Sequence, residues 1–259
     1  MAAAPGGGAR LTPITHAIMR YGTVIFDCDS TLSALEGIEM LAADVRAEVA
    51  ELTASAMAGE VPLEEVYARR LELIRPHRDD VQALVPRYVE GLVDDAEATV
   101  GALTSAGLAV RVISGGLLPA VTGLARHLGL DTDAVAAVPI AFDEAGTYAG
   151  FDDVGPARAG GKAEVIRAWK ADGLPRPVMF VGDGATDLEA AGDVELFVAY
   201  AGVVERPEVV AAAPVVVRSR SLAPVVPLAL GGKRPDDDRA AVVYDRGVQL
   251  IEQGTVEWR

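Results

Sequence analysis

Short apolar runs alternate with longer amphipathic stretches through most of this 259-residue chain. The first run, residues 23–26, leads directly into acidic residues. A buried parallel strand has this pattern when its carboxyl end opens onto a site. Strands and helices of this length in alternation predict an α/β fold with a parallel central sheet and helices on both faces. The expected strands are 23–26, 108–113, 178–181, 196–200 and 215–217, and the expected helices between them are 96–106, 118–128, 162–171 and 188–191.

Two stretches interrupt this alternation. Between residues 36 and 91, apolar positions recur every three or four residues with no strand between them, which is typical of amphipathic helices. We interpret this stretch as a small helical cap, inserted after the first strand. Residues 135–142 and 147–151 are expected to form a β excursion around a Gly-containing turn. The helices expected in the cap are 36–57, 63–74 and 79–89.

The two ends of the chain differ in composition from the rest. Residues 1–20 begin with many Gly and Pro and are expected to form a flexible leader. Residues 231–259 begin with a polar linker, and within them 242–258 holds short β-like runs broken by two Gly-containing segments. This pattern predicts a C-terminal extension that contains a short β-hairpin or three-strand unit. The core domain is then expected to comprise residues 21–35 and 92–230.

Acidic residues outnumber basic ones by 38 to 23, which gives a net charge of −15. Such a surface disfavours nucleic acids and anionic membranes as partners, and no apolar run approaches the ~18 residues of a membrane span. The one cysteine, Cys28, excludes an internal disulfide, and residues 1–8 lack the basic and apolar pattern of a signal peptide. We therefore expect a cytoplasmic protein with a small-molecule ligand, and the sequence leaves both a monomer and a homodimer open.

Asp27 and Asp29 directly follow the first predicted strand. Residues two apart in an extended chain point the same way, so both carboxylates can face a site while Cys28 faces away. Asp-x-Asp by itself is more often a solvated acidic turn. Beside a hard cation, however, one carboxylate can attack phosphorus while the other donates a proton to the leaving oxygen. An EF-hand is excluded, because Leu32 and Ile38 stand where its loop requires Gly and Glu.

Asp183 and Asp187 lie in Gly-Asp-Gly-Ala-Thr-Asp, directly after another predicted strand. Two carboxylates flanked by glycines at a strand end suit a Mg²⁺ site that keeps waters and binds a substrate phosphate. The same segment on its own fits a strand-to-helix turn in which acidic residues cap the helix. Two acidic clusters in one chain, each after a strand, favour a metal-assisted site over two unrelated turns.

Two further segments offer groups that can bind a phosphate. Ser114-Gly115-Gly116 ends a predicted strand just before a helix, where backbone N–H groups and a hydroxyl can meet an anion, although this sequence is also common in loops. Lys162 follows Gly160-Gly161 at the start of a helix and can neutralise phosphoryl oxygens. A Walker A loop is excluded here, because Pro156 and Ala163 stand where that motif requires Gly and Ser or Thr.

These segments together resemble the four motifs of the haloacid dehalogenase (HAD) superfamily. The motifs are Asp27-x-Asp29-Ser-Thr, Ser114-Gly-Gly, Lys162 and Gly182-Asp-Gly-Ala-Thr-Asp187. Within that superfamily the chain is most similar to the phosphoserine phosphatases, through Glu36-Gly-Ile, Met57-Ala-Gly-Glu-Val-Pro, Arg70-Leu-Glu-Leu-Ile, Tyr148-Ala-Gly-Phe-Asp and Gly160-Gly-Lys. The resemblance covers about residues 20 to 220. It implies a Rossmann-like HAD core with a helical cap after the first strand.

The resemblance implies a role for each matched acidic residue. Asp27 would be the nucleophile and a ligand of Mg²⁺. Asp29 would be the general acid and base, and its backbone carbonyl would also bind the metal. Asp183 would complete the protein ligands, and Asp187 would support the metal site.

The resemblance also implies how the substrate is held. Ser114, Gly115 and Lys162 would bind the phosphoryl group. Glu36 would meet a substrate ammonium and Arg70 a substrate carboxylate, which agrees with the preference of carboxylates for the guanidinium fork. Arg70 by spacing alone is indistinguishable from a residue of a solvated helix face. The full implied set for substrate binding is Glu36, Met57, Arg70, Ser114, Gly115 and Lys162.

The activity that follows from the resemblance is Mg²⁺-dependent hydrolysis of O-phospho-L-serine through an aspartyl-phosphate. One alternative is a phosphatase with the same core that acts on another small phosphorylated amino acid or amine. Leu63 stands where the family usually has Phe, which leaves the substrate fit open. A second alternative is a non-catalytic scaffold that binds a phosphorylated ligand. The presence of every catalytic residue of the four motifs argues against such a scaffold.

Overall fold

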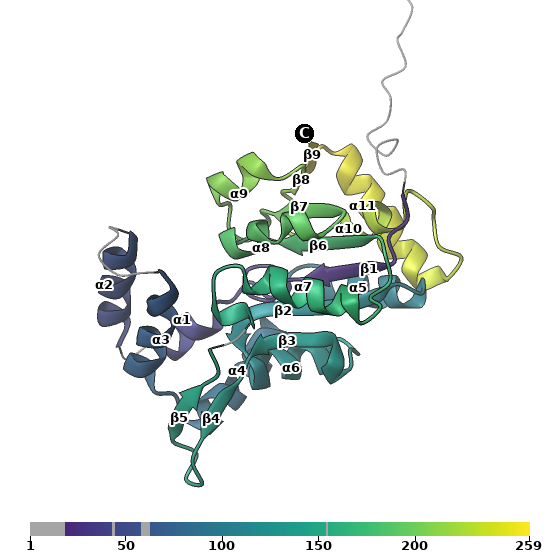
Figure 1. Ribbon diagram of the computed structural model, residues 1–259. Helices are drawn as coiled ribbons and strands as arrows, with labels where there is room; N and C mark the ends of the chain where they lie inside the picture. Colours follow the sequence, from purple (N-terminus) through teal and green to yellow (C-terminus); the bar gives the residue numbers. More distant parts are fainter. Residues whose placement is uncertain (1–18, 43–44, 58–62, 154) are drawn as a thin grey trace, which may run out of the picture.

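A seven-stranded sheet forms the centre of the protein in the computed structural model, which describes residues 19–42, 45–57, 63–153 and 155–259. Its strands are β1 Thr23–Phe26, β2 Ala109–Leu117, β3 Val135–Val138, β6 Val178–Gly182, β7 Leu196–Tyr200, β8 Val215–Val217 and β9 Val256–Trp258. They are arranged in the order β3-β2-β1-β6-β7-β8-β9, and all neighbours are parallel except β8 and β9 (Figure 1). The predicted α/β fold with a mostly parallel sheet is confirmed.

The central strands bring their carboxyl ends to one edge of the sheet. Phe26, the last residue of β1, pairs with Val112 of β2 and with Val181 of β6. β1 and β6 are buried along their whole length, as expected of strands with helices on both faces. The residues that follow β1 and β6 therefore emerge side by side, at the edge where open α/β sheets bind ligands.

Helices cover both faces of the sheet (Figure 1). They are α5 Ala96–Ser105, α6 Leu118–His127, α7 Gly161–Ala171, α8 Ala185–Glu189, α9 Pro207–Ala212, α10 Val225–Ala229 and α11 Asp238–Glu252. Helices α5, α6, α10 and α11 share one apolar core with Val24 and Phe26, whereas α7 and α9 share the other with Ile25. Alternate residues of β1 thus enter opposite cores. No helix in the described part of the chain is long and apolar enough to span a bilayer.

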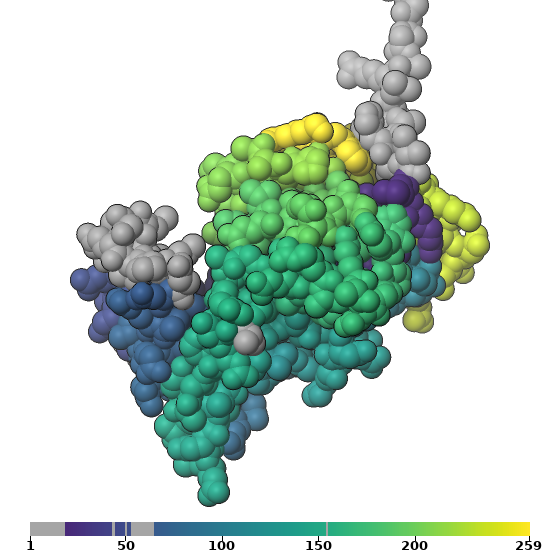
Figure 2. All heavy atoms as spheres, in the orientation of Figure 1, coloured from purple at the N-terminus to yellow at the C-terminus, as the bar shows by residue number. Residues whose placement is uncertain are grey.

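The described residues between β1 and α5 form helices α1 Gly37–Leu41, α2 Arg46–Met57, α3 Leu63–Ile74 and α4 Arg78–Glu90. The single helix expected at 36–57 is thus two helices, α1 and α2. This insertion projects from one side of the sheet-containing body (Figure 2). Helix α4 packs on α6, where a Cβ atom on Gly123 would lie 2.4 Å from the Val85 side chain. This close approach anchors the insertion on the core.

The β excursion after α6 is confirmed, with one change. β4 Ile140–Phe142 and β5 Tyr148–Phe151 form a separate antiparallel pair, which projects from the body (Figure 1). The range 135–142, expected to be continuous, divides at Pro139 into β3 of the main sheet and β4 of the hairpin. Proline lacks the N–H that a continuing strand needs, so the chain leaves the main sheet there.

The prediction of a β-hairpin or three-strand unit within 242–258 is wrong. Residues 238–252 form helix α11, which begins with Asp237 accepting a hydrogen bond from the N–H of Ala240 at 2.8 Å, and β9 joins the central sheet beside β8. Gly247, which the sequence suggests as a strand break, lies inside the helix. A Cβ atom there would lie 2.3 Å from the carbonyl oxygen of Ala223. This glycine therefore allows close packing rather than a turn, and the buried face of α11 has the helical spacing Ala240, Ala241, Val243, Tyr244, Gly247, Ile251.

The contact at Gly247 predicts a stability difference between two glycine-to-alanine changes in helices. Gly247→Ala should destabilise the protein by about 1–3 kcal/mol, because the new methyl group must displace backbone at Ala223. Gly101→Ala in α5 is the matched control, since a Cβ atom there meets no atom within 4 Å; it should be neutral or stabilise by up to about 1 kcal/mol. Urea unfolding measures both, and equal effects would contradict the packing of α11 on Ala223.

Candidate active site

A cavity of about 200 Å³ lies at the carboxyl edge of the sheet, between the core and the insertion. It contains Asp27 and Asp29 after β1, Ser114 and Gly115 of β2, and Asp183 after β6. A larger groove of about 950 Å³ between α5 and α11 contains none of the predicted site residues. The side chain of Met57 is outside the described part of the chain. The other predicted site residues all line the smaller cavity: Asp27, Asp29, Glu36, Arg70, Ser114, Gly115, Lys162, Asp183 and Asp187.

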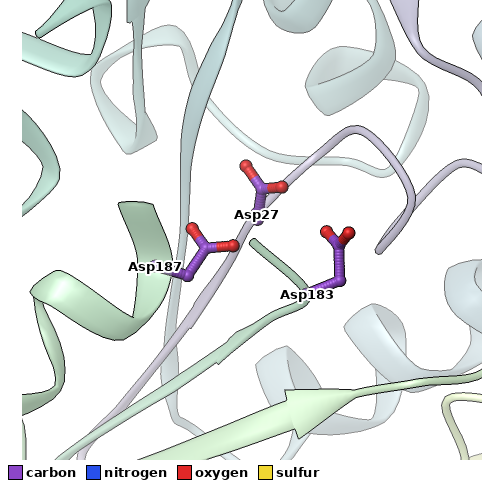
Figure 3. Close-up of side chains that lie close together, drawn as sticks. All are labelled: Asp27, Asp183 and Asp187. Atoms are coloured by element: carbon purple, nitrogen blue, oxygen red, sulfur yellow. The ribbon is translucent and has the colours of Figure 1, made fainter. Parts of the chain in front are cut away.

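Three buried carboxylates gather at the bottom of this cavity. Asp27, Asp183 and Asp187 each offer an oxygen, and these oxygens all lie within 4.8 Å of one another (Figure 3). The ammonium group of Lys162, at the start of α7, lies 2.7 Å from Asp27 Oδ1 and 2.6 Å from Asp187 Oδ1. Gly182 makes room for this arrangement, because a Cβ atom there would lie 2.5 Å from the carboxyl carbon of Asp187.

Burial and neighbouring carboxylates raise the pKa values of Asp27 and Asp183. Burial, and next the charge of Asp187, raise the pKa of Asp27 well above its usual range, although Lys162 opposes the shift. Burial and Asp187 also raise the pKa of Asp183 to about 6. Burial by itself lowers the pKa of Lys162, but Asp187 and Asp27 outweigh it and raise that pKa above its ordinary value. The cluster is therefore short of positive charge.

This donor set fits a hard divalent cation. Its donors are carboxylate oxygens, which Mg²⁺, Ca²⁺ and Mn²⁺ prefer, and a cation would relieve the repulsion among them. Asp27 and Asp183 are the side chains that would hold it, with Asp187 close beside them. The carboxylate of Asp29 is not part of this cluster, and the metal contact expected from its backbone carbonyl stays a prediction.

The carboxyl group of Asp29 is held by two hydrogen bonds from the insertion. The Tyr88 hydroxyl of α4 donates to Asp29 Oδ1 at 2.5 Å, and the backbone N–H of Gly37 donates to the same carboxylate. Burial, and then the charge of Glu36, raise the pKa of Asp29 to about 7, although the bond from Tyr88 opposes the shift. A carboxyl group with this pKa can both give and take a proton at neutral pH. Cys28 between the two acids is fully buried, as expected from their alternation.

The expected phosphate-binding turn lies inside a strand rather than after it. β2 continues through Ser114 and Gly115 to Leu117, beyond the end expected at residue 113. Ser114 Oγ accepts a hydrogen bond from the N–H of Gly116 at 2.9 Å. The carbonyl of Gly115 accepts one from the Tyr67 hydroxyl of α3 at 2.8 Å, so the insertion contacts the core at this part of β2.

Glu36 and Arg70 form the wall of the cavity that the insertion supplies. Glu36 Oε1 accepts a hydrogen bond from Ser30 Oγ at 2.7 Å, and Arg70 forms an ion pair with Glu39 at 3.2 Å. Arg206, which is not among the predicted site residues, also lines the cavity: its Nε lies 3.0 Å from Asp183 Oδ2 and its terminal nitrogen lies 3.5 Å from Glu36 Oε1. Its place in the loop after β7, another strand that ends at this edge, is the signal by which it could have been found.

A family model for haloacid dehalogenase-like hydrolases matches residues 21–194 of this chain. The chain is a haloacid dehalogenase-like hydrolase. Phosphoserine phosphatase from Mus musculus is 39% identical over 189 residues, which cover 72% of this chain and 84% of that protein. The chloroplastic phosphoserine phosphatase of Arabidopsis thaliana is 38% identical over 193 residues, 73% of this chain and 65% of that protein.

Solved structures of HAD phosphatases share the fold. A phosphoserine phosphatase described as a phospho-aspartyl intermediate analogue has a TM-score of 0.66 and 25% identity, and the match covers 80% of this chain and 98% of that one. A phosphoserine phosphohydrolase-like protein from Francisella tularensis has the same TM-score and identity, and the match covers 82% of this chain and 98% of that one. With the carboxylate site intact, this HAD hydrolase is an enzyme, a phosphatase.

The pKa values of the site predict how the metal-free protein responds to pH. Asp29 and Asp183 have folded-state pKa values of about 7 and about 6, above the ~4 of an unfolded chain. Between pH 5 and pH 7 the folded state therefore binds more protons than the unfolded state, and stability falls as the pH rises. The melting temperature in EDTA should decrease over this range; an increase would contradict the raised pKa values.

Magnesium chloride should raise the melting temperature at pH 7 and weaken this pH trend, because a cation among the carboxylates favours their charged forms. Asp183→Asn should lose most of the magnesium effect. Asp245→Asn, whose partner Arg234 lies on the exposed surface of the C-terminal part, is the control and should retain it.

Proposed function

We propose that this phosphatase hydrolyses O-phospho-L-serine to L-serine and phosphate, with Mg²⁺ as its cation. The observation that carries the proposal is the pair of opposite charges, Glu36 and Arg70, that faces the same cavity as Asp27. A phosphorylated amino acid carries one ammonium and one carboxylate besides its phosphate, and this pair can meet both. The mouse and Arabidopsis relatives, both phosphoserine phosphatases, support the same substrate.

In the proposed reaction Asp27 and Asp29 divide the chemistry. A carboxylate oxygen of Asp27 attacks phosphorus, and the bond from phosphorus to the serine oxygen breaks. Asp29 gives its proton to that oxygen, so serine leaves as a neutral alcohol and the phosphoryl group stays on Asp27. A water molecule then gives a proton to Asp29 and attacks the phosphorus, which releases phosphate and restores both carboxyl groups.

The other residues of the cavity hold the reacting groups in place. We assign Lys162 to the phosphoryl oxygens, together with Ser114 and Gly115 of β2, since a buried ammonium stabilises negative charge there. A magnesium ion bound at Asp27 and Asp183 would supply further charge neutralisation and orientation for the phosphoryl group. Asp187 accepts hydrogen bonds from both Lys162 and the N–H of Gly184, which suits a residue that supports the metal site.

A panel of phosphomonoesters separates this proposal from the alternatives. With Mg²⁺ the enzyme should prefer phosphoserine to phosphothreonine, phosphoethanolamine and 4-nitrophenyl phosphate, and EDTA should abolish turnover. Preference for another amine or amino acid phosphate would identify a phosphatase with a different cap specificity. Binding without turnover of any ester would support the scaffold instead.

The cellular compartment of the enzyme is also proposed. The one cysteine of the chain, Cys28, is free and buried, which suits a reducing compartment. We place the enzyme in the cytoplasm on that ground, and the location stays a prediction.

Asp27→Asn should abolish phosphoserine hydrolysis, because the amide cannot attack phosphorus. The loss should exceed about 10³-fold in kcat, in keeping with the contribution of an activated nucleophile. Denatured wild-type enzyme quenched during turnover of ³²P-labelled substrate should carry label, and the variant should carry none. Hydrolysis by Asp27→Asn at the wild-type rate would overturn the assignment.

Arg70→Ala should raise KM for phosphoserine at least about tenfold more than KM for 4-nitrophenyl phosphate, since only the former presents a carboxylate to the guanidinium. Arg69→Ala is a matched control on the same helix, because Arg69 is half exposed and pairs with Glu65 instead of lining the cavity. It should leave both KM values unchanged. Equal rises for the two esters in Arg70→Ala would show that Arg70 does not bind the carboxylate.

A further inference from the structure

Tyr88 is one of the largest fully buried side chains of the protein, with 1% of its surface exposed. It lies in α4, near the end of the insertion, 59 positions after Asp29, to which its hydroxyl donates a hydrogen bond. The four sequence motifs do not include it. Tyr88 nevertheless contacts the proposed general acid. Nothing in the sequence around Tyr88 indicates this contact.

Two glycines leave room for the Tyr88 hydroxyl. A Cβ atom on Gly37 would lie 2.1 Å from the hydroxyl oxygen, and one on Gly116 would lie 3.3 Å from it. Gly37 is the first residue of α1, and Gly116 belongs to β2 beside the proposed phosphate-binding turn. A polar group fits this slot because it has a partner there, the carboxyl of Asp29.

The two ends of the insertion thus meet at one carboxyl group. Gly37, where the insertion begins, donates its N–H to Asp29, and Tyr88, near its end, donates its hydroxyl. Two donors from different segments restrict the rotation of a short side chain far more than one would. With Tyr88 donating to Oδ1, a proton carried by Asp29 resides on the other oxygen, Oδ2.

We propose that Tyr88 is a positioning residue that holds the carboxyl of Asp29 in the orientation needed to pass a proton to the leaving oxygen. This inference rests on the proposed function, because it takes Asp29 as the general acid. Tyr88 itself does not react. It acts through Asp29 by selecting which oxygen bears the proton and where that oxygen lies.

The role of the proton depends on the leaving group. When Asp27 attacks phosphorus, the leaving oxygen of serine would depart as a strongly basic alkoxide unless it receives the proton of Asp29. The oxygen of 4-nitrophenol departs as a stable anion and needs no such proton. A misoriented Asp29 should therefore slow formation of the phosphoenzyme from an alkyl ester but not from the nitrophenyl ester.

The test is Tyr88→Phe, which keeps the buried ring and removes only the hydroxyl. We expect kcat/KM for phosphoserine to fall at least about tenfold, a fraction of the 10²–10⁴ that a general acid supplies. For 4-nitrophenyl phosphate kcat/KM should stay within about twofold of wild type. Since Asp29 also takes the proton of the attacking water, nitrophenol should appear in a burst followed by slower turnover.

Gly37→Ala provides an independent way to disturb the same contact, since its methyl group would displace the Tyr88 hydroxyl. It should show the same discrimination between the two esters. Tyr200→Phe is the matched control: Tyr200 is also 1% exposed, and its hydroxyl donates to the carbonyl of Arg220, away from the cavity. It should lower neither kcat/KM, whatever its effect on melting temperature.

If Tyr88→Phe lowers kcat/KM equally for both esters, the residue only supports the fold. If kcat/KM for phosphoserine is unchanged, the residue has no role in proton transfer. Either result overturns the inference. Failure of the proposed substrate is distinguishable. If the wild-type enzyme prefers another alkyl phosphate to phosphoserine, the substrate assignment is wrong, and the same comparison made with that ester still decides the role of Tyr88.

Discussion

The chemistry of this site depends on like charges that are held together out of water. Asp27, Asp183 and Asp187 bring oxygens within 4.8 Å of one another, and Lys162 is the ammonium group in contact with two of them. Arg206 pairs with Asp183 from the edge of the cavity. Buried charges are costly unless they are paired, and these two cations do not fully neutralise three carboxylates. The register of parallel strands imposes the arrangement, since β1 and β6 end side by side. The cluster is therefore prepared for a divalent cation and for a phosphoryl group bound to it.

In the proposed function, reaction and substrate recognition are divided between two parts of the chain. Asp27, Ser114 and Asp183 lie on or just after strands whose positions the sheet determines. Glu36 and Arg70 lie in the insertion between β1 and β2, which rests on the core through the close contact of α4 with α6. If Glu36 and Arg70 bind the substrate as proposed, changes in the insertion alter substrate choice without disturbing the carboxylate cluster. The same division accounts for how one core can serve several phosphatases.

Asp29 connects these two parts. It follows β1 in the core, but the groups that hold its carboxyl, Gly37 and Tyr88, belong to the insertion. Tyr67 makes a similar connection at the carbonyl of Gly115. The position of the insertion thus affects both Asp29, the proposed general acid, and the segment of β2 proposed to bind the phosphate. Under the proposed function, these contacts couple substrate recognition to proton transfer.

The residues that the sequence revealed are those with local signals. Acidic residues directly after apolar runs locate Asp27, Asp29 and Asp183, because the end of a buried strand and the residue after it are neighbours in the chain. Alternation of strands and helices likewise predicts the parallel sheet. Glu36 and Arg70 needed a family resemblance, since a charged residue on an amphipathic helix otherwise looks solvated.

Only the tertiary structure revealed contacts between distant segments. Arg206 reaches Asp183 from the loop after β7, and Tyr88 reaches Asp29 across 59 residues. Gly247 resembles a strand break in the sequence, but it lies inside a helix. A glycine is needed there because the backbone of Ala223, in another segment, packs against it. Hydrophobic periodicity determines which elements form and which faces they bury. Which side chains then meet depends on how those faces pack once the chain has closed on itself, and no local pattern contains that information.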